Sequence, residues 1–208
     1  MSYRREACCC SLDDVIAAGR TGACRIELCE QLEIGGVTPS EEFLRDTMDA
    51  SELPVNVLVR PRGGNFFYSE AEVQQMMESI RLCRRLGVNG VVIGALTPGG
   101  SVDLPLMRRL MAEARPLSVT FHRAFDVCAE PVSALEDIIA LGCDRLLTSG
   151  HAANAFEGRY FIGRLVAQAS GRIVIMAGCG VRPGNIRQIS AASGAPEYHS
   201  SFISENWP

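Results

Sequence analysis

Residues 120–126, Thr-Phe-His-Arg-Ala-Phe-Asp, combine three groups that suit proton transfer and anion binding. His122 can act as an acid or a base, Asp126 adds a carboxylate, and Arg123 adds a cation beside them. A second carboxylate, Glu27, lies in the apolar run Arg-Ile-Glu-Leu-Cys. We take Glu27, His122 and Asp126 as candidate catalytic residues.

Two further segments have side chains or backbone that suit an anionic ligand. Arg60 and Arg62 stand in a turn before two glycines, and guanidinium groups grip carboxylates or phosphates through paired hydrogen bonds. Gly178 and Gly180 precede Pro183, which suits a first helical turn, and bare N–H groups at a helix start favour an anion. A plain turn would also use glycine there, so both interpretations stay open. The remaining candidates for ligand binding at strand ends are Arg123, Ser149, Gly150, His199 and Ser200.

Three of the nine cysteines, Cys8, Cys10 and Cys29, lie in two apolar runs near the N-terminus. Soft thiolates select Cu(I), so these side chains could bind copper. No CxxC or Cys/His spacing accompanies them, and packing as small apolar side chains is the alternative. The odd number of cysteines in a chain of 208 residues favours reduced thiols over disulfides.

Eight short apolar runs alternate with longer amphipathic stretches, the pattern of βαβ units with a parallel sheet. A glycine shortly before a strand recurs four times, each time before an even-numbered run, which favours a closed barrel over an open doubly wound sheet. We therefore predict one (β/α)₈ TIM-barrel domain over residues 1–208. The predicted strands are 5–10, 25–29, 55–60, 90–94, 117–122, 145–149, 173–177 and 197–200.

The alternation of side chains along a strand decides which groups face the barrel interior. In a barrel, the carboxyl ends of the strands carry the functional groups. Arg25 and Glu27 could instead pair with each other as a structural ion layer. The side chains predicted to face inward are Glu6, Cys8 and Cys10 on the first strand, Arg25, Glu27 and Cys29 on the second, and Thr120 and His122 on the fifth.

Helix starts are predicted by the capping boxes that begin at Ser11 and Ser69 and by Pro131. The sequence stops within ten residues of the eighth predicted strand, whereas a barrel usually takes about 250 residues. We expect the final helix to be missing. The apolar surface left beside the seventh, eighth and first strands would be covered by another subunit or by local rearrangement, so we expect a homo-oligomer.

The composition limits the classes of partner and of chemistry. A net charge of −4 and a pI near 5.5 argue against nucleic-acid and anionic-membrane partners, so a small ligand is expected. No apolar run reaches the roughly 18 residues of a membrane span, and the first ten residues lack a signal-peptide layout, which favours the cytoplasm. All 20 basic residues are arginine, which excludes Schiff-base catalysis by lysine.

Taken together, these motifs resemble the CutC family over nearly the whole chain. The resemblance implies a cytoplasmic, oligomeric barrel with a role in copper homeostasis, in which the cysteines matching Cys8 and Cys29 carry the link to copper. Asn65 departs from the aspartate usual in the family, and Cys179 from the usual glycine or alanine. The matching segments are 25–29 (RIELC), 35–40 (GGVTPS), 60–64 (RPRGG), 120–126 (TFHRAFD), 147–150 (LTSG) and 199–201 (HSS).

Three hypotheses follow. The first is a copper-homeostasis protein that binds Cu(I) through Cys8 and Cys29, with Cys10 as a possible third ligand. The second is an enzyme for a small anionic or phosphorylated metabolite, in which Glu27 and His122 exchange protons with the bound substrate. The third is a barrel that serves only as an interaction scaffold.

Overall fold

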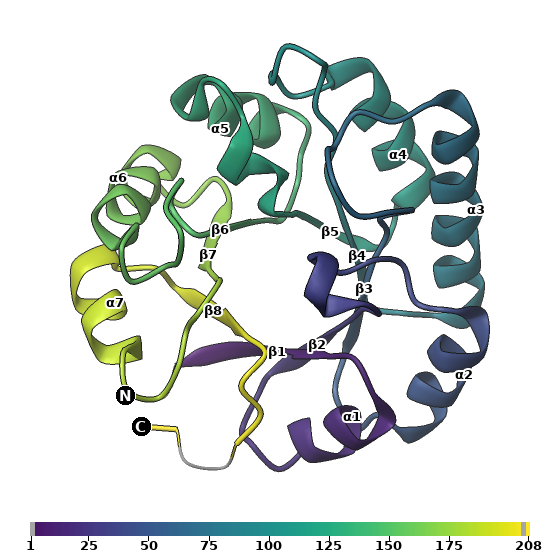
Figure 1. The fold of residues 1–208 in the computed structure, drawn as a ribbon, viewed down its shortest axis with the longest axis horizontal. Helices are drawn as coiled ribbons and strands as arrows, with labels where there is room; N and C mark the ends of the chain where they lie inside the picture. Colours follow the sequence, from purple (N-terminus) through teal and green to yellow (C-terminus); the bar gives the residue numbers. More distant parts are fainter. Residues whose placement is uncertain (1–2, 205–206) are drawn as a thin grey trace.

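Eight parallel strands close into a barrel in the computed structural model, which describes residues 3–204 and 207–208 (Figure 1). Each strand pairs with its neighbour in sequence, and β1 closes on β8 with Glu6 opposite His199. The predicted closed barrel is thus confirmed, and the open sheet is excluded. The strands are β1 (Arg4–Cys9), β2 (Arg25–Leu28), β3 (Val55–Leu58), β4 (Gly90–Ile93), β5 (Ser118–Phe121), β6 (Arg145–Thr148), β7 (Val174–Ala177) and β8 (Glu197–Ser200).

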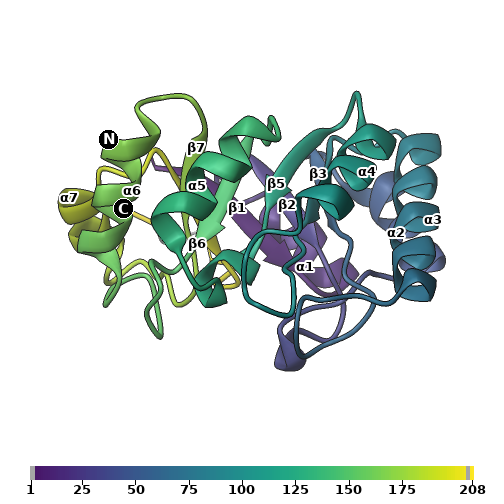
Figure 2. The same ribbon diagram turned by 90° about the horizontal axis from the view of Figure 1, so that it is seen from above.

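Helices surround the strands, with α2 to α4 on one side and α5 to α7 on the other (Figure 2). Two short 3-10 helices, η1 and η2, follow β2 and β5 and lie near the carboxyl ends of the strands. None of the described helices is long and apolar enough to cross a membrane. The helices are α1 (Leu12–Ala18), η1 (Leu32–Ile34), α2 (Glu41–Ala50), α3 (Glu70–Leu86), α4 (Leu104–Ala114), η2 (Arg123–Val127), α5 (Pro131–Ala140), α6 (Arg159–Ala169) and α7 (Ile186–Ser193).

Local sequence signals set most helix starts. Ser69 caps α3 in a complete capping box with Glu72, and Pro131 is the first residue of α5, both as predicted. Pro183 is not the first residue of a helix, contrary to the prediction. The helix α7 begins three residues later, at Ile186. The Asn185 side chain accepts a hydrogen bond from the Arg182 N–H, at 2.8 Å, and this contact holds the intervening residues in a turn.

The end of the described chain covers part of the barrel's outer surface. No helix follows β8 among residues 201–204 and 207–208, which agrees with the predicted lack of a final helix. The Trp207 ring packs against the core and lies beneath the Arg5 guanidinium, 4.3 Å from it.

The alternation of side chains along the strands produces two buried regions, one between the sheet and the helices and one inside the barrel. Side chains such as Ile26, Leu28 and Phe121 point outward into the large apolar layer between sheet and helices. Inside the barrel the apolar cluster is small, comprising Cys8, Cys29, Leu58 and Val92 with Cys10 packed against it. The rest of the barrel interior is lined mainly by polar side chains.

Candidate functional site

A fully paired ion layer fills the lower part of the barrel. Arg25 donates hydrogen bonds to both Glu6 and Glu197, each at 2.5 Å, and Arg145 donates to Glu197 at 2.9 Å. Burial raises the pKa of Glu6, but hydrogen bonds from His199 and the charge of Arg25 outweigh it and lower the pKa to about 2. The suggested pairing of Arg25 with Glu27 is therefore wrong, because the carboxylates that occupy Arg25 come from β1 and β8.

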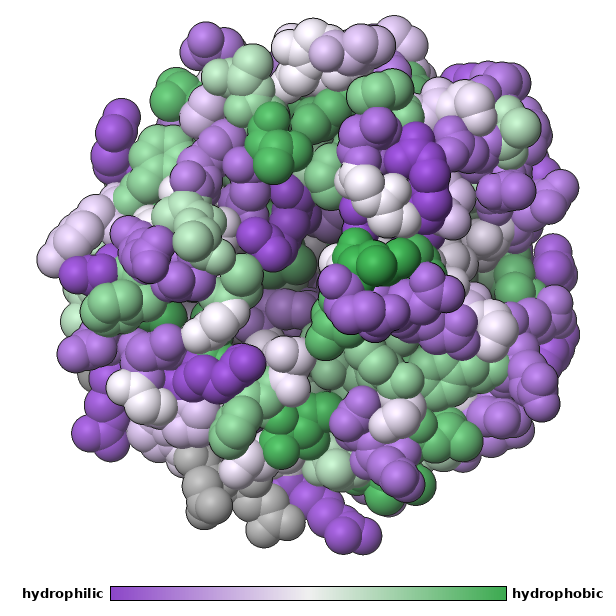
Figure 3. All heavy atoms as spheres, in the orientation of Figure 1, coloured by the Kyte–Doolittle hydropathy of each residue, from purple (hydrophilic) through white to green (hydrophobic). Residues whose placement is uncertain are grey.

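Above this layer, the carboxyl ends of the strands surround a cavity of about 380 Å³. Figure 3 shows this face of the molecule hollowed near its centre. Most of the predicted site residues from six different strands or strand ends converge there, as the barrel fold requires. The predicted residues that line the cavity are Cys8, Glu27, Cys29, Arg60, His122, Arg123, Asp126, Gly180, His199 and Ser200.

Four predicted ligand-binding residues lie outside this lining. Arg62 is occupied elsewhere, since it donates to Glu72 at 2.5 Å and to the carbonyl oxygen of Phe67 at 2.9 Å. Ser149, Gly150 and Gly178 use their N–H groups to fix the rim. The acceptors are Asp126 for Ser149, the Thr148 hydroxyl for Gly150 and the Thr148 carbonyl for Gly178.

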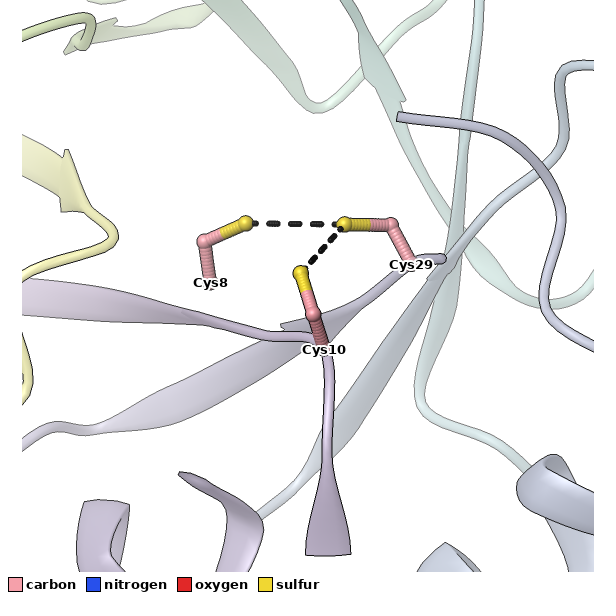
Figure 4. A group of neighbouring side chains, drawn as sticks. All are labelled: Cys8, Cys10 and Cys29. Atoms are coloured by element: carbon pink, nitrogen blue, oxygen red, sulfur yellow. Dashed lines mark hydrogen bonds between the residues drawn. The ribbon is translucent and has the colours of Figure 1, made fainter. Parts of the chain in front are cut away.

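Three thiols meet at the ends of β1 and β2, where Figure 4 shows them pointing toward one another. The Cys29 sulfur lies 3.3 Å from that of Cys10 and 3.7 Å from that of Cys8. All three sulfurs lie within 4.8 Å of one another. Strand pairing explains the contact, because Cys9 lies opposite Leu28 and the next residue on each strand is a cysteine.

The three thiols differ in acidity. Hydrogen bonds from Cys29 and Cys8 lower the pKa of Cys10, because they stabilise its thiolate. Hydrogen bonds with Cys10 and Cys29, together with burial, raise the pKa of Cys8. The hydrogen bond with Cys10 and burial raise the pKa of Cys29, and they outweigh its bond with Cys8, which lowers it. Within the cluster, ionisation is therefore favoured at Cys10 over Cys8 and Cys29. Such a set of soft donors fits a monovalent, thiophilic ion.

Glu27 and His199 lie beside Cys8, and one ligand atom from each residue lies within 4.8 Å of the other two. His199 Nδ1 is 2.9 Å from Glu6 Oε1 but 4.0 Å from Glu27 Oε2, which has no hydrogen-bond partner in the described chain. Burial raises the pKa of Glu27 to about 7. Burial lowers the pKa of His199, but the carboxylates of Glu27 and Glu6 outweigh it, and the net shift is upward.

His122 is held as a neutral hydrogen-bond donor. It caps η2, and its Nδ1 accepts a hydrogen bond from the Ala124 N–H at 3.2 Å. Burial, followed by the charge of Arg60, lowers the pKa of His122 to about 3. A neutral ring whose Nδ1 is an acceptor carries its proton on Nε2, and this atom has no partner among the described residues.

Asp126 and Arg60 have extensive structural contacts. Asp126 accepts from the Thr148 hydroxyl at 2.5 Å, the Ser149 N–H at 2.9 Å and Arg123 Nε at 2.8 Å. The Arg60 guanidinium donates to three carbonyl oxygens of neighbouring loops, those of Ile34, Gly36 and Gly64, at 3.3, 3.0 and 2.8 Å. Both side chains fix loops as well as lining the cavity.

Sequence reasoning missed two residues that define the interior. Glu197 completes the ion layer, and parity could have found it, because it stands two positions before the inward-facing His199. Phe66 lines the cavity from the loop after β3, with its ring centroid 5.1 Å from that of His122. No regular pattern in the loop sequence indicates that contact.

The fold and cavity together define a (β/α)₈-barrel protein with a thiol cluster and acid–base groups at its carboxyl-end rim. The sequence matches the CutC family over residues 3–204, so the chain belongs to that family. A CutC family protein from Parabacteroides distasonis is 52% identical over 197 residues, covering 94% of this chain and 81% of the relative. The human relative, named copper homeostasis protein cutC homolog, is 47% identical over 199 residues, covering 96% and 73%.

Solved structures agree on the fold. The crystal structure of a proposed copper homeostasis protein CutC from Streptococcus agalactiae superposes with a TM-score of 0.92 at 31% identity, covering 98% of this chain and all of the other. A crystal structure described as a deoxyribose-phosphate aldolase from Coccidioides immitis superposes with a TM-score of 0.69 at 12% identity, covering 96% of this chain and 81% of that one. The second likeness concerns the barrel alone.

Proposed function

We propose that this protein binds Cu(I) through Cys8, Cys10 and Cys29 and acts in copper homeostasis. The observation that carries the proposal is the convergence of three sulfurs, within 4.8 Å of one another, at the mouth of the barrel. Relatives named for copper homeostasis support the same assignment. The chemistry of the donors also favours it, since soft thiolates prefer Cu(I) to harder divalent ions.

The burial pattern suits a site that takes up and releases an ion. Cys8 and Cys29 are buried and line the cavity, whereas Cys10 is partly exposed, so the cluster can be reached without unfolding the barrel. The lowered pKa of Cys10 favours its thiolate, and the thiolate is the form of cysteine that binds metal. The ion would be a cargo of the protein.

The proposed site also bears on location and assembly. All nine cysteines are free thiols, and thiols stay reduced in the cytosol, so we place the protein in the cytoplasm. A homo-oligomer remains our prediction. Sedimentation velocity of the reduced protein tests it, and a single monomeric species at high protein concentration would contradict it.

An anaerobic titration with a colorimetric Cu(I) chelator tests the function. The reduced protein should bind one Cu(I) per chain. Losing a residue that only hydrogen-bonds to a metal ligand typically lowers metal affinity about 10- to 100-fold. Cys29→Ser removes a ligand itself, so it should lower the Cu(I) affinity by more than that. Cys83→Ser is the matched control, because Cys83 is buried in α3 outside the cavity. Equal affinities of wild type and Cys29→Ser would contradict the proposal.

A further inference from the structure

Three residues that line the cavity carry a buried polar atom without a hydrogen-bond partner in the described chain, and none of them is a cysteine. The atoms are His122 Nε2, Glu27 Oε2 and Arg60 Nε. His122 is only 4% exposed, and Glu27 and Arg60 are each 5% exposed. An unpaired buried polar group costs free energy, and such groups in folded proteins call for a partner. These atoms therefore point to a ligand that supplies the partners.

The His122 side of the cavity is positive and offers donors. Arg60 lies close enough to lower the pKa of His122, and its Nε has no hydrogen-bond partner among the described residues. Phe66 packs against both residues, with its ring centroid 4.8 Å from the Arg60 guanidinium carbon and 5.1 Å from the His122 ring. A cation, a neutral N–H donor and an aromatic face together suit a carboxylate with a short apolar body.

The Glu27 side offers the complementary group. Glu27 Oε2 is a free acceptor, held 4.0 Å from the nearest His199 nitrogen, and it suits a hydroxyl or amino hydrogen of a ligand. Leu58 and Leu147 line the apolar wall between the two sides. The volume of about 380 Å³ is at the low end of small-molecule sites.

We propose that the cavity binds a small organic acid, whose carboxylate accepts from His122 Nε2 near Arg60 and whose hydroxyl or amino group donates to Glu27 Oε2. This site adjoins the proposed copper site, because Glu27 and Cys8 offer ligand atoms within 4.8 Å of each other, but none of its three side chains is a cysteine. Its test needs no copper, so the failure of either proposal leaves the other standing.

The test uses reduced, metal-free protein and ligand-observed NMR with four probes: glycolate, lactate, acetate and inorganic phosphate. The proposal predicts that glycolate or lactate binds more tightly than acetate, which lacks the hydroxyl. His122→Ser keeps an N-cap acceptor for the Ala124 N–H but loses the Nε2 donor, so binding should weaken about 10- to 100-fold. His122→Gln, which restores a donor, should recover part of the affinity.

Two matched variants make the result specific. His151→Asn changes a histidine outside the cavity lining and should leave binding unchanged. Cys83→Ser changes a buried thiol of α3 outside the cavity lining and should also retain hydroxy-acid binding. Failure of all four probes to bind, binding of phosphate alone, or equal hydroxy-acid affinity of wild type and His122→Ser would overturn the proposal.

Discussion

The lower and upper halves of the barrel interior use similar side chains in opposite ways. In the lower half, Glu6, Arg25 and Glu197 satisfy one another through short ion pairs. In the upper half, Glu27 and His122 are just as deeply buried, yet each keeps an atom without a partner in the described chain. Burial alone thus does not distinguish a structural group from a functional one.

The pKa values express the same difference. The pKa of the paired Glu6 falls to about 2, whereas the pKa of the unpaired Glu27 rises to about 7. The reason is that charge pairing outweighs desolvation in one half and is too weak to do so in the other. In barrels, the carboxyl-end face carries function and the opposite face carries stability, and here the pairing of buried charges follows that division.

The largest expected effect comes from breaking the lower layer. Arg25→Met keeps the volume of the side chain but leaves Glu6 and Glu197 without their shared cation. It should lower the free energy of unfolding by about 3–5 kcal/mol, measured by urea denaturation at pH 7. The control is Arg172→Met, which breaks an exposed pair with Glu136 and should have a far smaller effect, because solvent screens that pair. Equal losses in both variants would refute the structural role of the lower layer.

An intermediate effect should appear as a pH dependence in the upper half. The folded pKa of His122 is about 3, below the unfolded value near 6.5. Below pH 6.5 the unfolded chain gains a proton at this position that the folded chain does not, so stability is lost as the pH falls from 6.5 toward 3. Between pH 7.5 and 5, wild type should lose about 2 kcal/mol relative to His122→Ser.

That comparison uses denaturation curves of both proteins at each pH, so that contributions from other groups cancel. His151→Asn is the control and should follow wild type. A constant difference between wild type and His122→Ser over this range would show that His122 titrates normally and is not held neutral.

The smallest expected effect concerns Asp126, which lines the cavity yet is paired like the lower layer. Thr148→Val removes the hydroxyl that donates to Asp126 and accepts from the Gly150 N–H. It should lower the free energy of unfolding by about 1–2 kcal/mol and leave Cu(I) affinity unchanged, as measured by thermal unfolding and chelator competition. A loss of copper binding without a loss of stability would place Asp126 among the functional groups instead.

The sequence was sufficient to predict the barrel and the direction of its inward-facing side chains. All eight strands lie within two residues of the predicted ranges, because alternation and recurrent glycines are properties of the local sequence. The meeting of Cys10 with Cys29 follows from the same parity. The family resemblance, too, rested on short motifs that the comparisons confirm.

Pairing across the barrel could not be predicted in the same way. Arg25 bonds to Glu197, far away in sequence, and no local pattern shows which of several inward carboxylates a given arginine will reach. Arg62 was expected to face a ligand, but the turn directs it to Glu72 on α3. The tautomer of His122 likewise depends on one backbone N–H, that of Ala124, which only the folded loop brings into contact.

X-ray absorption at the copper edge of the Cu(I)-loaded protein identifies the atoms bound to the ion and so tests the thiol site itself. We expect a shell of three sulfur donors from Cys8, Cys10 and Cys29, reduced to two in Cys10→Ser. A shell that contains nitrogen or oxygen from His199 or Glu27, or one that Cys10→Ser leaves unchanged, would contradict it.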